Sequence, residues 1–175
     1  DRVILDHKAT FLAGSPAIWK NLGSYIKETG STYPSVRSLV MFGAPIPGDL
    51  HEALKNGLPG GDTYTPYGAT ESLPVANTSG SAVLERRGLI EGGHGVYIGK
   101  ELESAQVKII ERSLDVIEKM EDIKELGPYE VGEIIVSSGT TTKSYFGLNE
   151  ATQKSKIKGP SEVWHRMGDV GYRDN

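Results

Sequence analysis

Short apolar runs alternate with segments of helical spacing in the first half of the chain, and this order constrains the fold most. Residues 9–13, 38–42 and 62–65 are predicted to be strands, because apolar, β-branched or aromatic residues dominate them. Residues 15–30 and 50–57 lie between these runs and have helical spacing. A strand–helix–strand–helix–strand order is typical of a parallel sheet with crossover helices, so it predicts an α/β fold.

The first of these helices carries clear signals at both ends. A serine and a proline at residues 15–16 supply a hydroxyl cap followed by the imino acid that is favoured at the first helical position. Ile18, Leu22 and Ile26 then recur on one face, and Gly30 ends the helix. We expect that face to be buried.

The second half of the chain has a different pattern, after a polar stretch at residues 77–95. A boundary there divides the chain into a parallel α/β segment at residues 1–80 and a β-rich segment at residues 81–175. Many short strands between turn residues predict a small antiparallel sheet or partial barrel. These strands are expected at residues 96–98, 106–111, 133–136, 141–146 and 164–167.

Two polar stretches of the second half are not predicted to be strands. Residues 114–126 are charged, and they are compatible with either a surface helix or a long hairpin loop. Asn149 and the three residues after it predict a short capped helix. Lys154, Lys156 and Lys158 alternate with other residues and are interpreted as a solvated face.

Composition excludes several classes of protein. Lys and Arg number 19 against 23 Asp and Glu, a net charge of −4, so neither nucleic acid nor an anionic membrane is expected as a partner. No apolar run approaches the ~20 residues of a membrane-spanning helix. The chain has no cysteine, which excludes disulfide scaffolds, thiol nucleophiles and Cys-ligated zinc. Its four histidines are scattered, so no metal cluster is expected.

The ends of the sequence suggest a piece of a longer protein. The chain begins at Asp1, with neither an initiator methionine nor a signal peptide, and stops at residue 175, soon after a strand-like stretch. We expect an excised fragment. A small processed domain is the alternative.

The string Tyr-Gly-Ala-Thr-Glu at residues 67–71 is the strongest candidate site. It is expected just beyond a parallel strand, where ligands bind in open α/β sheets. Tyr67 offers a ring that can stack on a base, Thr70 a hydroxyl for a phosphate oxygen, and Glu71 a carboxylate for Mg²⁺. The same string is compatible with a tight turn that carries a surface glutamate.

Two further segments are compatible with either a ligand-binding site or an ordinary turn. The Gly-Ala-Pro loop at 43–45 follows another predicted strand, so it would lie at the same sheet edge as residues 67–71. In His-Arg-Met-Gly-Asp at 165–169, an aspartate after glycine at a strand end can accept two ribose hydroxyls. Each is equally compatible with an ordinary turn.

Taken together and in order, these strings resemble one family. GAP at 43–45, YGATE at 67–71, GEIIV at 132–136 and HRMGD at 165–169 are similar to the motifs of the adenylate-forming (AMP-binding, ANL) superfamily. That superfamily includes acyl-CoA synthetases, luciferases and peptide-synthetase adenylation domains. The resemblance spans nearly the whole chain and places both of its segments in one AMP-binding domain.

Longer strings at 65–76, 144–157 and 163–172 look closest to a narrower group. This is the β-lactone synthetase group of bacterial olefin biosynthesis, often labelled fatty acyl-AMP ligases. The sequence departs from the superfamily pattern at Thr65, where an asparagine is usual, and at 165–169, where Tyr-Arg/Lys-Thr-Gly-Asp is the commoner form.

The resemblance implies roles for particular residues. Tyr67 would stack on adenine, Asp169 would bind the ribose hydroxyls and Thr70 would hold the α-phosphate. Glu71 would hold Mg²⁺, so Thr70 and Glu71 are the expected catalytic residues. Ala69, Ser72 and Leu73, together with Gly68, would border the acyl chain. The full set implied for the nucleotide is Gly43, Ala44, Pro45, Thr65, Pro66, Tyr67, Gly68, Thr70 and Asp169.

The function implied is that of a fragment of an ATP-dependent ligase. ATP, Mg²⁺ and a fatty or 3-hydroxy fatty acid would give acyl-AMP, and a 3-hydroxy acid would close a β-lactone. The alternatives are a fragment of an acyl-CoA or acyl-carrier ligase, and a non-catalytic interaction domain on the same scaffold. The family's phosphate loop would lie upstream and its lysine-bearing domain downstream, so the isolated chain is expected to be inactive. The resemblance also implies a cytoplasmic protein.

Overall fold

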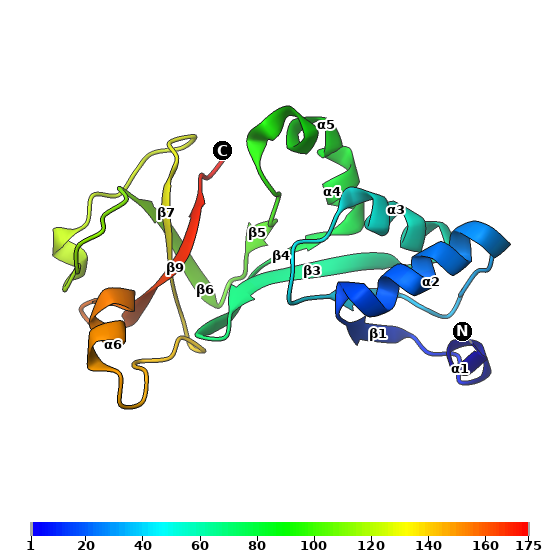
Figure 1. Ribbon diagram of the computed structural model, residues 1–175, viewed down its shortest axis with the longest axis horizontal. Coiled ribbons are helices and arrows are strands. Elements are labelled where there is room, and N and C mark those ends of the chain that lie inside the picture. The colour runs from blue at the N-terminus through cyan, green and yellow to red at the C-terminus, as the bar shows by residue number, and fades with distance from the viewer. Residues whose placement is uncertain (1, 175) are drawn as a thin grey trace. The chain divides into compact units, whose positions relative to one another are not determined.

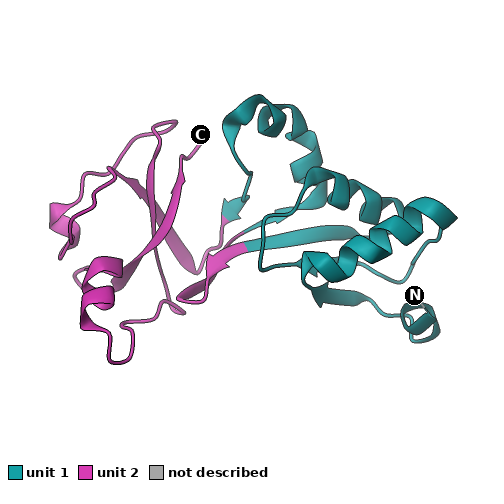
Figure 2. Ribbon diagram, viewed as in Figure 1, with its two compact units in different colours: residues 1–66, 77–100 teal, residues 67–76, 101–175 magenta. Residues whose placement is uncertain are grey.

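The computed structural model describes residues 2–174, which form two compact units (Figure 1, Figure 2). The first unit contains the described residues up to Pro66 together with Asn77–Lys100. The second contains Tyr67–Ala76 and the described residues from Glu101 onward. Strands β3 (Asp62–Ala69) and β4 (Ser72–Ser79) therefore each contribute residues to both units.

The predicted parallel sheet is confirmed as part of a sheet that contains β1 (Phe11–Gly14), β2 (Ser38–Met41), β3, β4 and β5 (Lys100–Glu101). β1 pairs with β2 and β2 with β3, both in parallel, so that Leu12 lies opposite Leu39 and Leu39 opposite Thr63. The sheet order is β1-β2-β3-β4-β5, and the two-residue connection from β3 to β4 requires antiparallel neighbours, so the sheet is mixed. The remaining elements up to β5 are α1 (Arg2–Asp6), α2 (Pro16–Thr29), α3 (Gly48–Asn56), α4 (Gly80–Glu85), α5 (Arg87–Leu89) and the π-helical turn η1 (Ile90–His94).

Helix α2 begins and ends where predicted, but the Ser15 hydroxyl makes no capping hydrogen bond and the buried face differs from the predicted one. Gly30 ends the helix in the left-handed region, at φ 69°, and donates its N–H to the Ile26 carbonyl. Ile18 is 59% exposed, whereas Trp19, Gly23 and Ile26 are buried. The reason is packing against α3: a β-carbon on Gly23 would lie 3.3 Å from the Leu50 side chain, so glycine permits the close approach.

No helix between residues 2 and 174 is long and apolar enough to cross a membrane.

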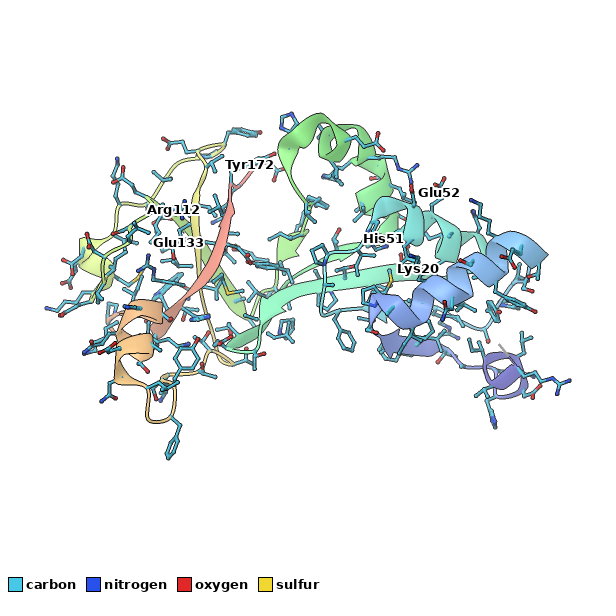
Figure 3. All side chains as sticks on the ribbon, in the orientation of Figure 1. Lys20, His51, Glu52, Arg112, Glu133 and Tyr172 are labelled. Atoms are coloured by element: carbon cyan, nitrogen blue, oxygen red, sulfur yellow. The ribbon has the colours of Figure 1, made fainter. Side chains whose placement is uncertain are left out.

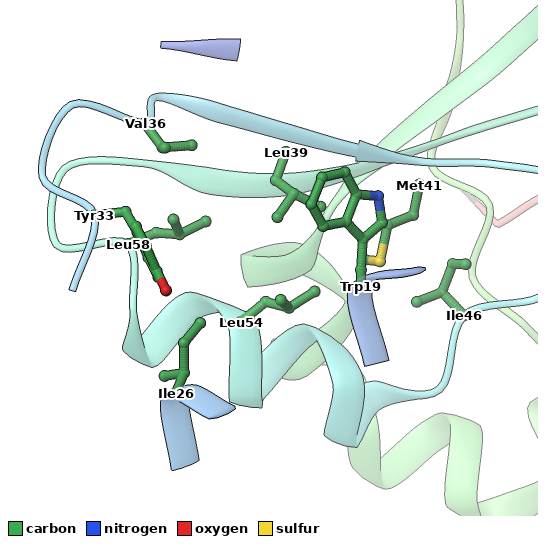
Figure 4. Close-up of a cluster of buried hydrophobic side chains, with 9 residues drawn as sticks. All are labelled: Trp19, Ile26, Tyr33, Val36, Leu39, Met41, Ile46, Leu54 and Leu58. Atoms are coloured by element: carbon green, nitrogen blue, oxygen red, sulfur yellow. The ribbon is translucent and has the colours of Figure 1, made fainter. Parts of the chain in front are cut away.

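The core of the first unit joins α2, α3 and the sheet (Figure 4). Trp19 and Ile26 come from α2, Leu54 from α3, and Leu39 and Met41 from β2. Tyr33, Val36, Ile46 and Leu58 complete this cluster from the connecting loops. Trp19 is therefore a core residue.

The second unit contains the predicted antiparallel sheet, in the order β6-β7-β9-β8. β7 lies in its middle and is buried along almost its whole length. Ile134 packs in one apolar cluster and Ile135 in another, because successive side chains of a strand point to opposite faces. This explains the apolar run of the GEIIV string. The elements are β6 (Ala105–Ile110), η2 (Met120–Asp122), β7 (Gly132–Ser138), α6 (Asn149–Ser155), β8 (Lys156–Lys158) and β9 (Val163–Gly171).

The strand predicted at residues 141–146 is wrong. The run is rich in threonine, but its backbone donors find partners outside any strand ladder. The Thr142 N–H donates to the Glu71 carbonyl at 2.8 Å, and the Tyr145 N–H donates to the Thr152 hydroxyl at 3.0 Å. Side-chain acceptors of this kind offer the backbone an alternative to a ladder.

Other predictions for the second half also need correction. Residues 96–98 are not a strand, since Gly95 and Gly99 on either side have φ of 88° and 89°, outside the extended region. The polar stretch at 77–95 contains the end of β4 and the helices α4 and α5. Residues 114–126 form a loop with one short 3₁₀ turn, so the loop alternative holds. The short helix predicted at Asn149 is confirmed as α6, but Leu148 occupies its cap position and no side chain makes a capping hydrogen bond.

A nearly buried ion pair joins two of the motif strings. The Arg166 side chain donates from Nε and Nη2 to the two carboxylate oxygens of Glu133, at 2.8 and 2.7 Å; Glu133 projects from β7 (Figure 3). The other guanidinium contacts are the carbonyl oxygens of Ser113, Asp115 and Lys154. One side chain therefore ties β9 and β7 to the loop at residues 113–115 and to helix α6.

We predict that Arg166→Met lowers the free energy of unfolding by about 3–5 kcal/mol, because it leaves the Glu133 carboxylate buried without its partner. Urea denaturation of the full-length protein measures this. Lys124→Met is the control, since Lys124 and Glu111 form an exposed pair that contributes little. Equal, small losses for the two variants would contradict the prediction.

Candidate functional site

The string at 67–71 lies at the tip of a hairpin and not in a loop beyond a strand. Tyr67, Gly68 and Ala69 continue β3, and only Thr70 and Glu71 form the turn that leads into β4. The predicted end of the strand at this string was therefore too early. The turn exposes Thr70 and leaves Glu71 half-buried.

Gly68 has a structural reason to be glycine. A β-carbon there would lie 2.7 Å from the Ser72 carbonyl oxygen and 2.6 Å from the Leu73 side chain. These contacts come from the returning strand β4, so glycine is needed at this position for the protein's own packing.

Tyr67 and Asp169 meet, although 102 residues separate them in the sequence. The Tyr67 hydroxyl donates to Asp169 Oδ2 at 2.7 Å. Burial is the main cause that raises the pKa of the Tyr67 phenol, and the hydrogen bond to the Asp169 carboxylate raises it further. The structure thus brings together two residues that the motifs had assigned to one ligand.

A bulge in β9 presents Asp169. Glu133 of β7 lies opposite Val170, and Ile135 lies opposite Arg166, so three residues of β9 face one residue of β7. Gly168 stands inside this bulge at φ 76°, a conformation that favours glycine. Bulges of this kind re-aim side chains next to functional sites. Asp169 is exposed and lies within β9. The sequence had instead placed it at the end of a strand.

The Glu71 carboxylate accepts a hydrogen bond from the Tyr145 hydroxyl, at 2.7 Å to Oε1. This hydrogen bond is the main reason that the pKa of the Glu71 carboxyl lies below its usual value. The other oxygen, Oε2, faces His165 Nε2 at 3.9 Å, which is too long for a hydrogen bond. His165 Nδ1 donates to the Ser155 carbonyl, so in the neutral ring Nε2 is an acceptor.

Lys156 lies near this cluster, and its burial corrects the sequence interpretation. Lys154 and Lys158 are exposed as expected. Lys156 is buried, with only 7% of its surface exposed. Its Nζ donates to the Thr142 hydroxyl at 3.0 Å and stands 5.6 Å from the centre of the Tyr145 ring. Burial lowers the pKa of Lys156, and the Glu71 carboxylate opposes that change.

The donor set at Glu71 fits a magnesium ion that is shared with a phosphate ligand. An ionised carboxylate oxygen is a hard ligand, and Mg²⁺ needs only one or two of them when phosphates supply the rest. Among residues 2–174, no group of three or more acidic or histidine side chains could hold a metal ion alone. Glu71 would therefore hold the ion only together with a substrate.

The residues implied for the acyl chain lie around the same hairpin. Leu73 is exposed, whereas Ser72 is buried and its hydroxyl contacts those of Ser138 and Thr141 at 3.1 and 2.9 Å. Ala69 is half-buried at the end of β3. Their acyl-binding role stays a prediction.

The remaining nucleotide residues belong to the first unit. Gly43, Ala44 and Pro45 follow β2 and are exposed, with Gly43 at φ 93°. Thr65 and Pro66 lie within β3, and the buried Thr65 hydroxyl has no hydrogen-bond partner among the described residues. Their convergence on the same ligand as Tyr67 and Asp169 stays a prediction.

Sequence reasoning did not find Tyr145 and Lys156. Both lie in the string that carried the narrower resemblance, at 144–157, but no local signal indicates that they face Glu71. Tyr145 is 74 residues from Glu71 in the sequence. Trp164, beside His165, is compatible from the sequence with either a core or a ligand-binding role, and the structure shows that it is a buried core residue.

We predict that Gly68→Ala costs about 1–3 kcal/mol of unfolding free energy, because the new methyl group overlaps the β4 backbone. Thermal and urea unfolding measure the loss. Gly139→Ala is the matched control, since nothing lies within 4 Å of a β-carbon there. If Gly68→Ala proves no less stable than Gly139→Ala, the close approach does not require glycine.

Comparison with known proteins adds to this geometry. The family model described as AMP-binding enzyme matches residues 2–146. An olefin β-lactone synthetase from Xanthomonas campestris pv. campestris is 39% identical over 171 residues, covering 94% of this chain and 30% of the relative. A 2-succinylbenzoate–CoA ligase from Bacillus subtilis is 32% identical over 171 residues, covering 97% and 29%. The chain thus spans about 30% of the length of these curated relatives.

A solved structure shows the same architecture. The O-succinylbenzoate coenzyme A synthetase from Bacillus subtilis, in complex with ATP and a magnesium ion, matches with a TM-score of 0.73 and 30% identity. The match covers 99% of this chain and 31% of that one.

Proposed function

The chain belongs to the AMP-binding enzyme family, and we propose that it is part of an ATP-dependent ligase that activates a carboxylic acid as an acyl-adenylate. The observation that carries the proposal is the Tyr67–Asp169 contact in the same unit as Glu71. It supports a single nucleotide site, with an aromatic face, a ribose acceptor and a metal ligand. The bound ATP and magnesium ion of the solved relative support the same ligands here.

The proposed reaction is an in-line displacement. The substrate carboxylate attacks the α-phosphorus of ATP, the bond to pyrophosphate breaks, and acyl-AMP forms. Tyr67 would stack on adenine, Asp169 would accept hydrogen bonds from the ribose hydroxyls, Thr70 would donate one to the α-phosphate and Glu71 would hold Mg²⁺. When bound, the ion would neutralise charge on the phosphate oxygens. Positioning and electrostatics would supply most of the catalysis.

The substrate that we propose is a fatty or 3-hydroxy fatty acid. The relative at 39% identity supports an olefin β-lactone synthetase. In that reaction the 3-hydroxyl oxygen attacks the acyl carbonyl, AMP leaves, the hydroxyl proton is released and a β-lactone remains. A CoA ligase is the second candidate, supported by the relative at 32% identity. For either candidate function, the use of ATP favours a cytoplasmic location.

We predict that the isolated 175-residue chain does not form acyl-AMP, because it spans only about 30% of the length of its curated relatives and we propose that the phosphate loop and the lysine-bearing domain belong to the remainder. ATP–pyrophosphate exchange with a panel of fatty acids measures this. The full-length protein is the positive control. Robust exchange by the chain alone would contradict the division of labour proposed here.

In the full-length protein, Glu71→Gln should lower kcat by roughly 10²-fold or more, the scale seen when one preorganised electrostatic group is lost. The substitution keeps the size of the side chain and removes the charge that holds Mg²⁺. Steady-state kinetics at saturating ATP measures the change. A normal kcat would exclude Glu71 as a metal ligand in the reaction.

Tyr67→Ala should instead raise KM for ATP with a smaller effect on kcat, because stacking acts equally on ground and transition states. Tyr67→Phe is its control: it keeps the ring, loses the hydrogen bond to Asp169 and should bind ATP nearly normally. An equal rise in KM for both variants would show that the hydroxyl matters and not the ring.

The product distinguishes the two candidate functions. With a 3-hydroxy acid and ATP but no coenzyme A, a β-lactone synthetase should release lactone, AMP and pyrophosphate, which mass spectrometry detects. If turnover requires coenzyme A and yields a thioester, the lactone proposal is wrong and the CoA ligase proposal stands.

A further inference from the structure

One segment of the second unit holds both the backbone and the side chain of Glu71. The Thr142 N–H donates to the Glu71 carbonyl at 2.8 Å, and three residues later the Tyr145 hydroxyl donates to Glu71 Oε1 at 2.7 Å. Glu71 stands in a two-residue turn, where its own neighbours impose little order on a side chain with three rotatable bonds. The order of the carboxylate therefore comes from residues 142–145.

Tyr145 is itself fixed from two sides. Its N–H donates to the Thr152 hydroxyl at 3.0 Å, and that hydroxyl donates to the Leu148 carbonyl at 2.9 Å. This ties Tyr145 to the start of α6. On the ring face, the Lys156 ammonium lies 5.6 Å from the centroid, within the range of a cation–π contact.

Lys156 also links the ring to the backbone contact. Its Nζ donates to the hydroxyl of Thr142, the residue whose N–H holds the Glu71 carbonyl. Among the described residues, no carboxylate lies within ion-pairing distance of this buried ammonium. A buried cation without an ion pair is costly, so its place against Tyr145 and Thr142 calls for a reason beyond stability.

We propose that Tyr145 is a positioning residue that holds the Glu71 carboxylate in the orientation in which it binds its cation. The inference rests on the proposed function, in which Glu71 binds Mg²⁺ together with ATP. Tyr145 does not touch the ion; it occupies one carboxylate oxygen and leaves the other for the metal.

The physical effect is preorganisation. A free glutamate side chain loses rotamer freedom when it binds a metal, and a side chain already held by a hydrogen bond avoids much of that loss. Loss of the phenol hydroxyl should therefore weaken metal binding without removing the ligand itself. We expect a three- to tenfold weaker affinity for Tyr145→Phe.

The test uses the full-length protein, Mn²⁺ as a spectroscopic probe and α,β-methylene-ATP, which cannot react at its α–β bond. Electron paramagnetic resonance gives the Mn²⁺ dissociation constant of the ternary complex. Tyr145→Phe keeps the ring over Lys156 and should raise this constant three- to tenfold, and Glu71→Gln should raise it further. Tyr25→Phe changes an exposed tyrosine of α2 and should leave it unchanged.

A double-mutant cycle separates positioning from other effects. In the Glu71→Gln background, Tyr145→Phe should have no further effect on Mn²⁺ binding, because the carboxylate it positions is gone. Tyr145→Leu removes both the hydroxyl and the ring, and it should also raise the Mn²⁺ dissociation constant. A purely structural role would lower the melting temperature and leave the Mn²⁺ dissociation constant unchanged.

The outcomes distinguish this inference from the proposed function. If Glu71→Gln weakens Mn²⁺ binding and both Tyr145 variants bind normally, the positioning role is wrong while the metal site stands. If Glu71→Gln itself binds Mn²⁺ normally, the metal assignment of the proposed function is wrong, and the role of Tyr145 falls with it. An equal loss from Tyr145→Phe in both backgrounds would also overturn the inference.

Discussion

A single guanidinium holds four segments of the second unit together. Arg166 forms a forked ion pair with Glu133 and donates to the carbonyl oxygens of three other residues. It sits on β9 immediately before the bulge that presents Asp169. Glu133 is on β7, the strand that pairs with β9 on both sides of the bulge. The strand that carries Asp169, the proposed ribose ligand, is thus anchored next to the bulge by an ion pair that needs no ligand.

Close backbone approach is a second constraint on the site. Gly68 lets the two strands of the hairpin meet where a methyl group would collide with the Ser72 carbonyl. Gly168 supplies the left-handed backbone inside the bulge. The two glycines therefore bring Tyr67 and Asp169 into contact from opposite ends of the unit's sequence. Both motif glycines therefore have a structural role in the fold.

The site combines ordered donors with carboxylates that remain open on one side. Tyr67 engages one oxygen of Asp169, and Tyr145 engages one oxygen of Glu71. A phenol is a suitable partner because it donates a hydrogen bond and brings no charge of its own at neutral pH. The carboxylates thereby keep their negative charge for a ribose and a cation in the proposed reaction. An arginine or lysine in direct contact would instead neutralise that charge.

The sequence by itself determined the local elements and the family of this chain. The ends of α2 at Ser15 and Gly30 and the apolar runs that become β2 and β7 are local patterns of residue type and spacing, which the sequence displays directly. The ordered motifs indicated the AMP-binding family and named Tyr67, Glu71 and Asp169. Tertiary structure alone decided the rest. The threonine-rich run at 141–146 forms a loop that donates hydrogen bonds to Glu71. Lys156 is buried although Lys154 and Lys158 are exposed. In α2, Trp19 is in the core and Ile18 is exposed. Each of these outcomes depends on a partner many residues away, because the free energy of a side-chain contact is set by what the fold places beside it.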